Sequence, residues 1–206
     1  MHTMKLFFFF MVCGICIFSC ATRDTRFSSA IDAGSDKLFV NLTDSSGFFL
    51  LPTEGIEKDM DMIQFLSAEF MGRNIFLQAL VKADKYVLEM LLFNELGVSM
   101  GELYYRDGVV DFSSNILPRT VMRLFNPVYI VADFQLCFYD PILLSKALED
   151  SGLTLVITDG DSNHSNRRIL NGNDVIIEIE KNENTVKLIN HLRRYTYTME
   201  GDFHEI

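Results

Sequence analysis

Three apolar or alternating runs follow one another between residues 63 and 93 with only short breaks between them. They cover residues 63–70, 74–82 and 86–93, and turn-forming residues such as Gly72 and Asp84 separate them. Parallel neighbours would need crossover connections of about a dozen residues or more, which this spacing does not provide. The runs therefore predict an antiparallel meander.

Further strand signals lie on either side of strong turn signals. Residues 101–105 and 109–112 flank Asp107-Gly108, a dipeptide typical of tight hairpins. Past the middle of the chain, residues 153–158, 168–170 and 175–180 have strand patterns, with an Asn171-Gly172 turn. We expect residues 185–199 to form one long last strand.

The region between the two groups of strands has helical features. Residues 118–125 place apolar side chains at helical spacing, whereas residues 128–139 are apolar enough to be strand or helix. Asp140 and Pro141 are the N-cap and first residue expected of a helix, and Gly152 is a suitable terminator. The fold class is therefore α+β, a large antiparallel sheet with two or three helices.

Two predicted strands are apolar on both faces. Residues 86–93 have only Glu89 as a charged interruption, and residues 75–81 have only Gln78 as a polar one. A sheet with one face in water should alternate apolar and polar residues. Helices, lipid or an apolar cavity could cover the second face, and helices are the commonest cover.

The N-terminal segment indicates export. Residues 6–19 are apolar but shorter than the roughly 20 residues of a membrane span, as in the core of a signal peptide. The following Ile17-Phe18-Ser19-Cys20 resembles the lipobox of bacterial lipoproteins, in which the cysteine is lipidated and becomes the new N-terminus. We expect a signal peptide over 1–19, a lipidated N-terminus and tether over 20–36, and a single domain over 37–206. An ordinary signal peptide and an uncleaved anchor are the alternatives.

The cysteines and the charge fit an exported, membrane-anchored domain. Cys13 and Cys16 would leave with the signal peptide, and Cys137 then lacks a disulfide partner. The net charge of −10 would become −11 on loss of Lys5. Such a charge argues against nucleic acid and anionic headgroups as partners. Because Ala21 replaces the aspartate that favours inner-membrane retention, we expect an outer-membrane lipoprotein facing the periplasm.

No catalytic, metal-binding or cofactor motif stands out. Asp159 and Asp161 do not complete a calcium loop, no His/Cys spacing suits zinc, and neither a nucleophile elbow nor a phosphate loop is present. We expect no enzymatic activity and no cofactor. A polar cluster around His191 and Arg193 would be the first indication to the contrary.

Residues 131–148 carry a resemblance to a known family. The stretch contains Ala132-Asp133-Phe134-Gln135-Leu136, then a proline and a short helix that ends in Ala147-Leu148. It resembles the central signature of an uncharacterised family of short bacterial lipoproteins that are often encoded in aryl polyene pigment clusters. The motif Asn166-Arg-Arg-Ile-Leu170 and the ending of residues 187–200 also follow that family's order.

That family is similar in pattern to the LolA/LolB lipoprotein carriers. The resemblance implies a strongly curved antiparallel sheet, an incomplete barrel with the helices on its concave side and an apolar cavity for acyl chains. We accordingly expect a lipoprotein that is anchored through Cys20 and that binds or transfers an acyl or polyene lipid. The candidate cavity residues are Leu77, Leu80, Leu88, Met90, Leu92 and Phe134. The alternative is an envelope scaffold that docks a protein partner, which a fully packed interior would favour.

Overall fold

The computed structural model describes residues 25–28, 38–70, 73–117, 126–159 and 165–201. Within them, β4 to β13 form a ten-stranded antiparallel sheet, and β1 adds a strand at one edge. The strands are β1 (Thr25–Ser28), β2 (Phe39–Asn41), β3 (Gly47–Phe49), β4 (Met60–Phe70), β5 (Arg73–Ala83), β6 (Leu88–Asn94), β7 (Ser99–Arg106), β8 (Val109–Ser114), β9 (Leu153–Asp159), β10 (Ser165–Asn171), β11 (Asp174–Lys181), β12 (Thr185–Asn190) and β13 (Tyr195–Glu200). The helices are η1 (Thr53–Gly55), α3 (Pro127–Phe138) and α4 (Pro141–Glu149).

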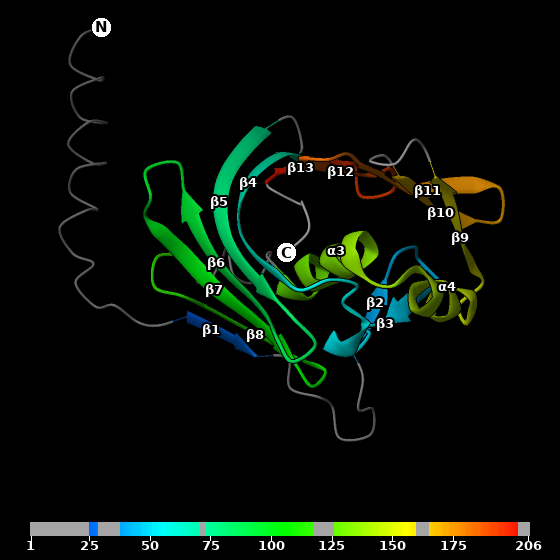
Figure 1. The fold of residues 1–206 in the computed structure, drawn as a ribbon, viewed down its shortest axis with the longest axis horizontal. Coiled ribbons are helices and arrows are strands. Elements are labelled where there is room, and N and C mark those ends of the chain that lie inside the picture. The colour runs from blue at the N-terminus through cyan, green and yellow to red at the C-terminus, as the bar shows by residue number, and fades with distance from the viewer. Residues whose placement is uncertain (1–24, 29–37, 71–72, 118–125, 160–164, 202–206) are drawn as a thin grey trace, which may run out of the picture.

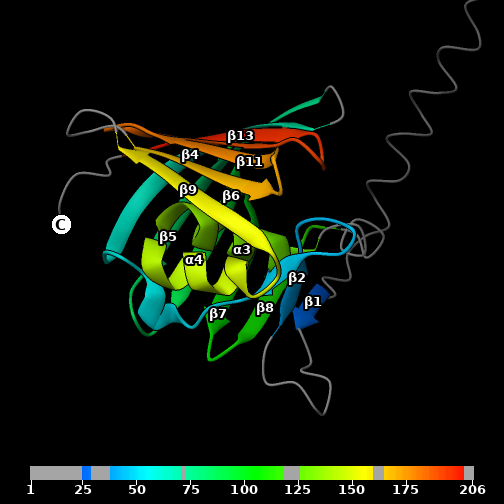
Figure 2. The same cartoon turned by 90° about the vertical axis from the view of Figure 1, so that its right-hand side faces the viewer.

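The large sheet consists of two meanders joined side by side. Its order is β1-β8-β7-β6-β5-β4-β13-β12-β11-β10-β9, so the junction is the antiparallel pair of β4 with β13. Strands β2 and β3 form a separate two-stranded sheet. Figure 1 shows α3 between the two meanders, consistent with its contacts with β8 and β12, and Figure 2 shows α4 beside β9. The predicted antiparallel meanders are confirmed.

Local chemistry explains the turns and helix ends. Asp107 and Gly108 both have positive φ, as a two-residue hairpin turn requires, and Gly152 with φ +77° follows the end of α4. The Asp140 carboxylate accepts hydrogen bonds from the backbone N–H groups of Ile142 and Leu143, both at 2.9 Å. The predicted N-cap of α4 is thus confirmed.

Residues 128–139, whose sequence pattern suited a strand or a helix, form helix α3 as far as Phe138. Asn126 caps α3 by accepting from the backbone N–H of Val128 at 3.0 Å, and Pro127 occupies the first position. Nine of the twelve residues of α3 are buried, which is why its sequence shows no polar face. The third candidate helix, residues 118–125, lies outside the described residues.

Two other expectations need correction. The sheet is neither closed nor strongly curled, so the strongly curved, incomplete barrel is wrong in that respect. Residues 185–199 form two strands because the chain reverses between β12 and β13, where Arg194 has a φ of +55°. Within the segment assigned to the tether, β1 pairs with β8, for example Phe27 with Phe112.

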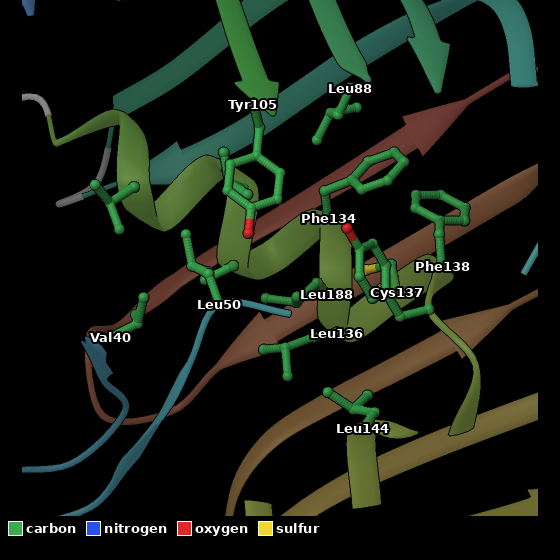
Figure 3. Packing of buried hydrophobic residues seen from close by; sticks show 14 of the residues in the cluster. Val40, Leu50, Leu88, Tyr105, Phe134, Leu136, Cys137, Phe138, Leu144 and Leu188 are labelled. Atoms are coloured by element: carbon green, nitrogen blue, oxygen red, sulfur yellow. The ribbon is translucent and has the colours of Figure 1, made fainter. Parts of the chain in front are cut away.

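One cluster of buried side chains fills the space between the sheet and the helices. It includes side chains from both meanders, from α3 and α4 and from the small β2–β3 sheet (Figure 3). Phe134 and Phe138 on α3 lie with ring centroids 4.9 Å apart, and Leu144 on α4 and Leu188 on β12 are fully buried in the same cluster. The inner face of the sheet is thus covered by the helices.

Gln135 fastens α3 to the segment that follows β3. Its side-chain oxygen accepts from the backbone N–H of Leu51 at 2.9 Å, and its side-chain nitrogen donates to the Leu51 carbonyl at 2.7 Å. The Tyr105 hydroxyl on β7 donates to the same carbonyl at 2.7 Å. The Leu51 backbone therefore joins three parts of the fold that are far apart in sequence.

We expect Gln135→Leu to lower the free energy of unfolding by about 1–3 kcal/mol, because the Leu51 N–H would lose its partner. Tyr105→Phe should cost less, about 1 kcal/mol, since Gln135 still donates to the Leu51 carbonyl. Urea denaturation of the two variants beside the parent measures both effects. A larger loss for Tyr105→Phe would contradict this account.

Candidate functional site

A chain of polar side chains runs from α3 to the junction of the two meanders. The Tyr195 hydroxyl lies 2.7 and 2.9 Å from the two carboxylate oxygens of Asp133, and the Asn190 side-chain nitrogen lies 3.3 Å from that hydroxyl. Because a tyrosine has one hydroxyl proton, Tyr195 donates to Asp133 and accepts from Asn190. The arrangement links α3 to β12 and β13.

This environment shifts the acidity of the groups in it. Loss of surrounding water raises the pKa of the Asp133 carboxyl to about 7, while the Tyr195 hydrogen bond and the Arg193 charge act in the opposite direction. Burial, followed by the Asp133 charge, raises the pKa of the Cys137 thiol to about 12. Cys137 is therefore a protonated, buried thiol.

A buried arginine donates hydrogen bonds to backbone carbonyl groups at the C-terminal end of α3. Arg167 on β10 is 5% exposed and donates to the carbonyl oxygens of Leu136 and Tyr139, at 3.2 and 2.9 Å. Its second guanidinium nitrogen lies 3.3 Å from the carboxylate of Glu57. Because the last carbonyls of a helix lack intrahelical donors, Arg167 satisfies groups that would otherwise be unpaired.

His191 and Arg193 have separate partners. The His191 ring lies 3.5 Å from the Glu178 carboxylate at the surface. The Arg193 guanidinium stacks 3.5 Å from the ring centre of Tyr129 and donates to the Asn41 carbonyl. Arg193 thus ties the turn before β13 to α3 and β2. The Arg193 backbone N–H also donates to the Asn190 side-chain oxygen at 2.9 Å, so Arg193 adjoins the polar chain of Asp133 and Tyr195.

The outer face of the sheet, opposite the helices, carries exposed apolar side chains. Along β5, Ala79, Val81 and Ala83 are buried, whereas the alternate residue Leu80 points outward. We define the outer patch as the exposed residues Ile63 (48%), Phe65 (58%), Phe76 (50%) and Leu80 (38%) on β4 and β5. Ile63 pairs directly with Leu80. The second apolar face is thus left uncovered by helices within the described residues.

A half-open pocket of about 360 Å³ lies at one end of this patch. Phe65 and Phe76 are exposed outer residues of neighbouring strands, and Glu200 pairs with Phe65 across the meander junction. The volume is within the range of about 300–1,000 Å³ typical of small-molecule sites. The residues that line the pocket are Phe65, Leu66, Ser67, Phe76, Leu77, Gln78, Asn94, Glu95 and Glu200.

The residues predicted to line a cavity occupy three different places. The four in the interior cluster are 0–6% exposed: Leu88, Met90, Leu92 and Phe134. Leu77 lines the half-open pocket, and Leu80 belongs to the outer patch. Strand alternation separates Leu80 from the interior set. A role of these residues in ligand binding stays a prediction.

Sequence reasoning missed Phe65 and Phe76 as pocket residues. The signal was present, because residues 63–70 and 74–82 carry apolar side chains at both odd and even positions. The strand pattern alone did not show which face the helices occupy.

Three findings concern the rest of the chain. Within the part that the structure describes, no group of three or more His, Cys, Asp or Glu side chains is arranged to hold a metal ion. In that same part, no helix combines the length and apolar character of a membrane span. The predicted lipidation site, Cys20, lies outside the described residues.

Comparison with known families gives one match. Residues 61–201 match the family described as "Protein of unknown function (DUF3261)". The match begins in β4 and ends just after β13, so it spans both meanders and both helices. No curated protein matches the chain.

We expect the Asp133 carboxyl to make stability fall as the pH rises from about 4 to about 7. Its pKa rises from 3.8 to about 7 on folding, so the folded state binds the proton more tightly and loses that advantage as the proton leaves. Asp133→Asn should therefore raise Tm, relative to the parent, by at least about 3 °C more at pH 8 than at pH 4.5. Thermal unfolding at the two pH values measures this difference.

The exposed Asp174 provides the matched control. Asp174→Asn removes the same charge from the first residue of β11 and should change Tm by a similar amount at both pH values. An Asp133→Asn variant with no pH-dependent gain over this control would contradict the assignment.

Proposed function

This chain belongs to the DUF3261 family, whose function is unknown. We propose that it is a non-enzymatic lipoprotein of the bacterial cell envelope, anchored in the outer membrane through Cys20, that binds or transfers a hydrophobic acyl or polyene lipid. The resemblance of its central motif to lipoproteins of the LolA/LolB type supports this proposal, as does the lipobox-like sequence before Cys20.

The half-open pocket beside the outer patch is the observation that carries the proposal. Two exposed phenylalanine rings, Phe65 and Phe76, stand at the pocket, and Ile63 and Leu80 continue the apolar surface along the same strands. Leaving large apolar side chains in water forgoes the free energy that burial would give. Contiguous exposed apolar surface of this kind is typical of a binding site.

The packed interior bears on where a ligand would bind. Leu88 and Phe134 are packed against other buried side chains of the protein. An acyl chain at that place would have to displace part of the core. The outer pocket requires no such rearrangement. We therefore place the ligand on the outer face.

A second candidate function is an envelope scaffold that docks a protein partner. The packed interior favours it, because a carrier with an internal cavity would have an unfilled core. The outer patch could then meet a partner's apolar surface instead of lipid. Binding of a small apolar probe at the pocket distinguishes the two, since a scaffold needs no pocket.

We expect the chain from residue 20 onward, which contains every described element, to bind the uncharged fluorescent probe N-phenyl-1-naphthylamine. Replacing both Phe65 and Phe76 by serine should weaken binding at least about tenfold, because the apolar walls are lost. Fluorescence titration gives the dissociation constants.

Tyr86→Ser is the matched control for this experiment. Tyr86 is an aromatic residue, 66% exposed, that lies in the turn at the far end of β5 from Phe76. Its replacement should leave probe affinity unchanged. Equal weakening by Tyr86→Ser, or no weakening in the double variant, would contradict binding at the pocket.

We expect Cys20→Ser in the full chain to abolish acylation, because serine offers no thiol to receive the lipid. Metabolic labelling with a radioactive fatty acid should label the parent and leave the variant unlabelled. Circular dichroism of the chain from residue 20 onward should be the same for the parent and the variant, since the described fold begins at Thr25. Labelling of the serine variant would refute the lipidated cysteine.

A further inference from the structure

The polar part of the outer pocket is acidic. Glu95 lies in the turn after β6, and Glu200 is the last residue of β13, so two strands on opposite sides of Phe65 and Phe76 each bring a carboxylate to the pocket. The other polar residues at the pocket are neutral: Ser67, Gln78 and Asn94. None of the described residues that line the pocket is basic.

The two carboxylates at the pocket should make binding depend on the charge of the ligand's polar group. A carboxylate accepts hydrogen bonds and donates none, so Glu95 and Glu200 pair with hydroxyl or ammonium donors. A negatively charged ligand group would be repelled by both, and the chain's net charge of −10 adds to that repulsion. The apolar walls at the same time favour a hydrocarbon chain.

We propose that the pocket takes an acyl chain whose polar end is uncharged and carries hydroxyl donors, such as an acyl ester of glycerol, and that it discriminates against the free carboxylate. Phe65 and Phe76 contact the hydrocarbon, and Glu95 and Glu200 accept hydrogen bonds from the hydroxyl groups. The inference rests on the proposed lipid-binding function and specifies the ligand class of the same site.

The test compares two ligands with the same acyl chain, 1-dodecanoylglycerol and dodecanoate, below their critical micelle concentrations. Each is titrated against the probe-loaded protein at a pH near 8, where dodecanoate is ionised. One unit charge repelled at about 4 Å in water corresponds to about a fivefold loss of affinity, so dodecanoate should bind at least about fivefold more weakly. The difference should shrink at about 1 M salt, where the screening length is about 3 Å.

A double variant assigns the discrimination to the pocket. Glu95→Gln with Glu200→Gln should bring the two affinities to within about twofold, because both carboxylates are gone. The control, Glu54→Gln with Glu102→Gln, removes two exposed charges outside the pocket and should leave the discrimination in place. It separates the local effect from the change in net charge.

The outcomes are distinct. Discrimination that is lost only in the pocket variant supports the proposal. Equal affinities for the two ligands, or tighter binding of dodecanoate, overturn this inference and leave the lipid-binding function standing. Binding of neither ligand overturns the proposed function and this inference with it.

Discussion

Helix α3 is held in place by side-chain hydrogen bonds to three segments far from it in sequence. Gln135 clamps the backbone of Leu51, Asp133 accepts from Tyr195, and Arg167 donates to the carbonyl groups at the end of α3. The surface of α3 is otherwise almost entirely apolar, and apolar packing is not directional. The hydrogen bonds therefore determine the position of the helix on the sheet. The motif Ala132-Asp133-Phe134-Gln135-Leu136 thus has a structural explanation: its polar residues tie the helix to β13 and to the segment after β3, and its apolar residues fill the core.

Within the described residues, α3 and α4 pack on the inner face of the sheet, whereas no helix covers the outer patch. Strands β4 and β5 have apolar residues on both sides, and the interior uses only one of them. The fold does not require Phe65 and Phe76 to be aromatic, since neither side chain is buried. Packing in the core therefore does not account for the apolar character of these two side chains.

Much of the fold could be predicted from sequence because the turns carry strong local signals. Asp107-Gly108, Asn171-Gly172 and the Asp140-Pro141 cap each specify a backbone geometry within a few residues. The reversal between β12 and β13 was missed because residues 191–194 contain neither glycine nor proline, and Arg194 adopts positive φ without such a signal. The apolar character of both faces of β5 was visible in the sequence. Which face is covered depends on where the helices lie, and only long-range packing decides that.

The edge strand β1 has a consequence for how the molecule would stand on a bilayer. Residue 20 is five residues from Thr25, a reach of at most about 17 Å, so a lipid on Cys20 would keep the β1–β8 edge close to the headgroups. Strands are spaced about 4.8 Å apart, which puts β6 to β4 some 15–25 Å along the sheet from that edge and β9 roughly 50 Å away. If Cys20 carries the predicted lipid, the β1–β8 edge is therefore the part of the sheet nearest the anchor, and the strands of the aromatic pocket lie farther from it.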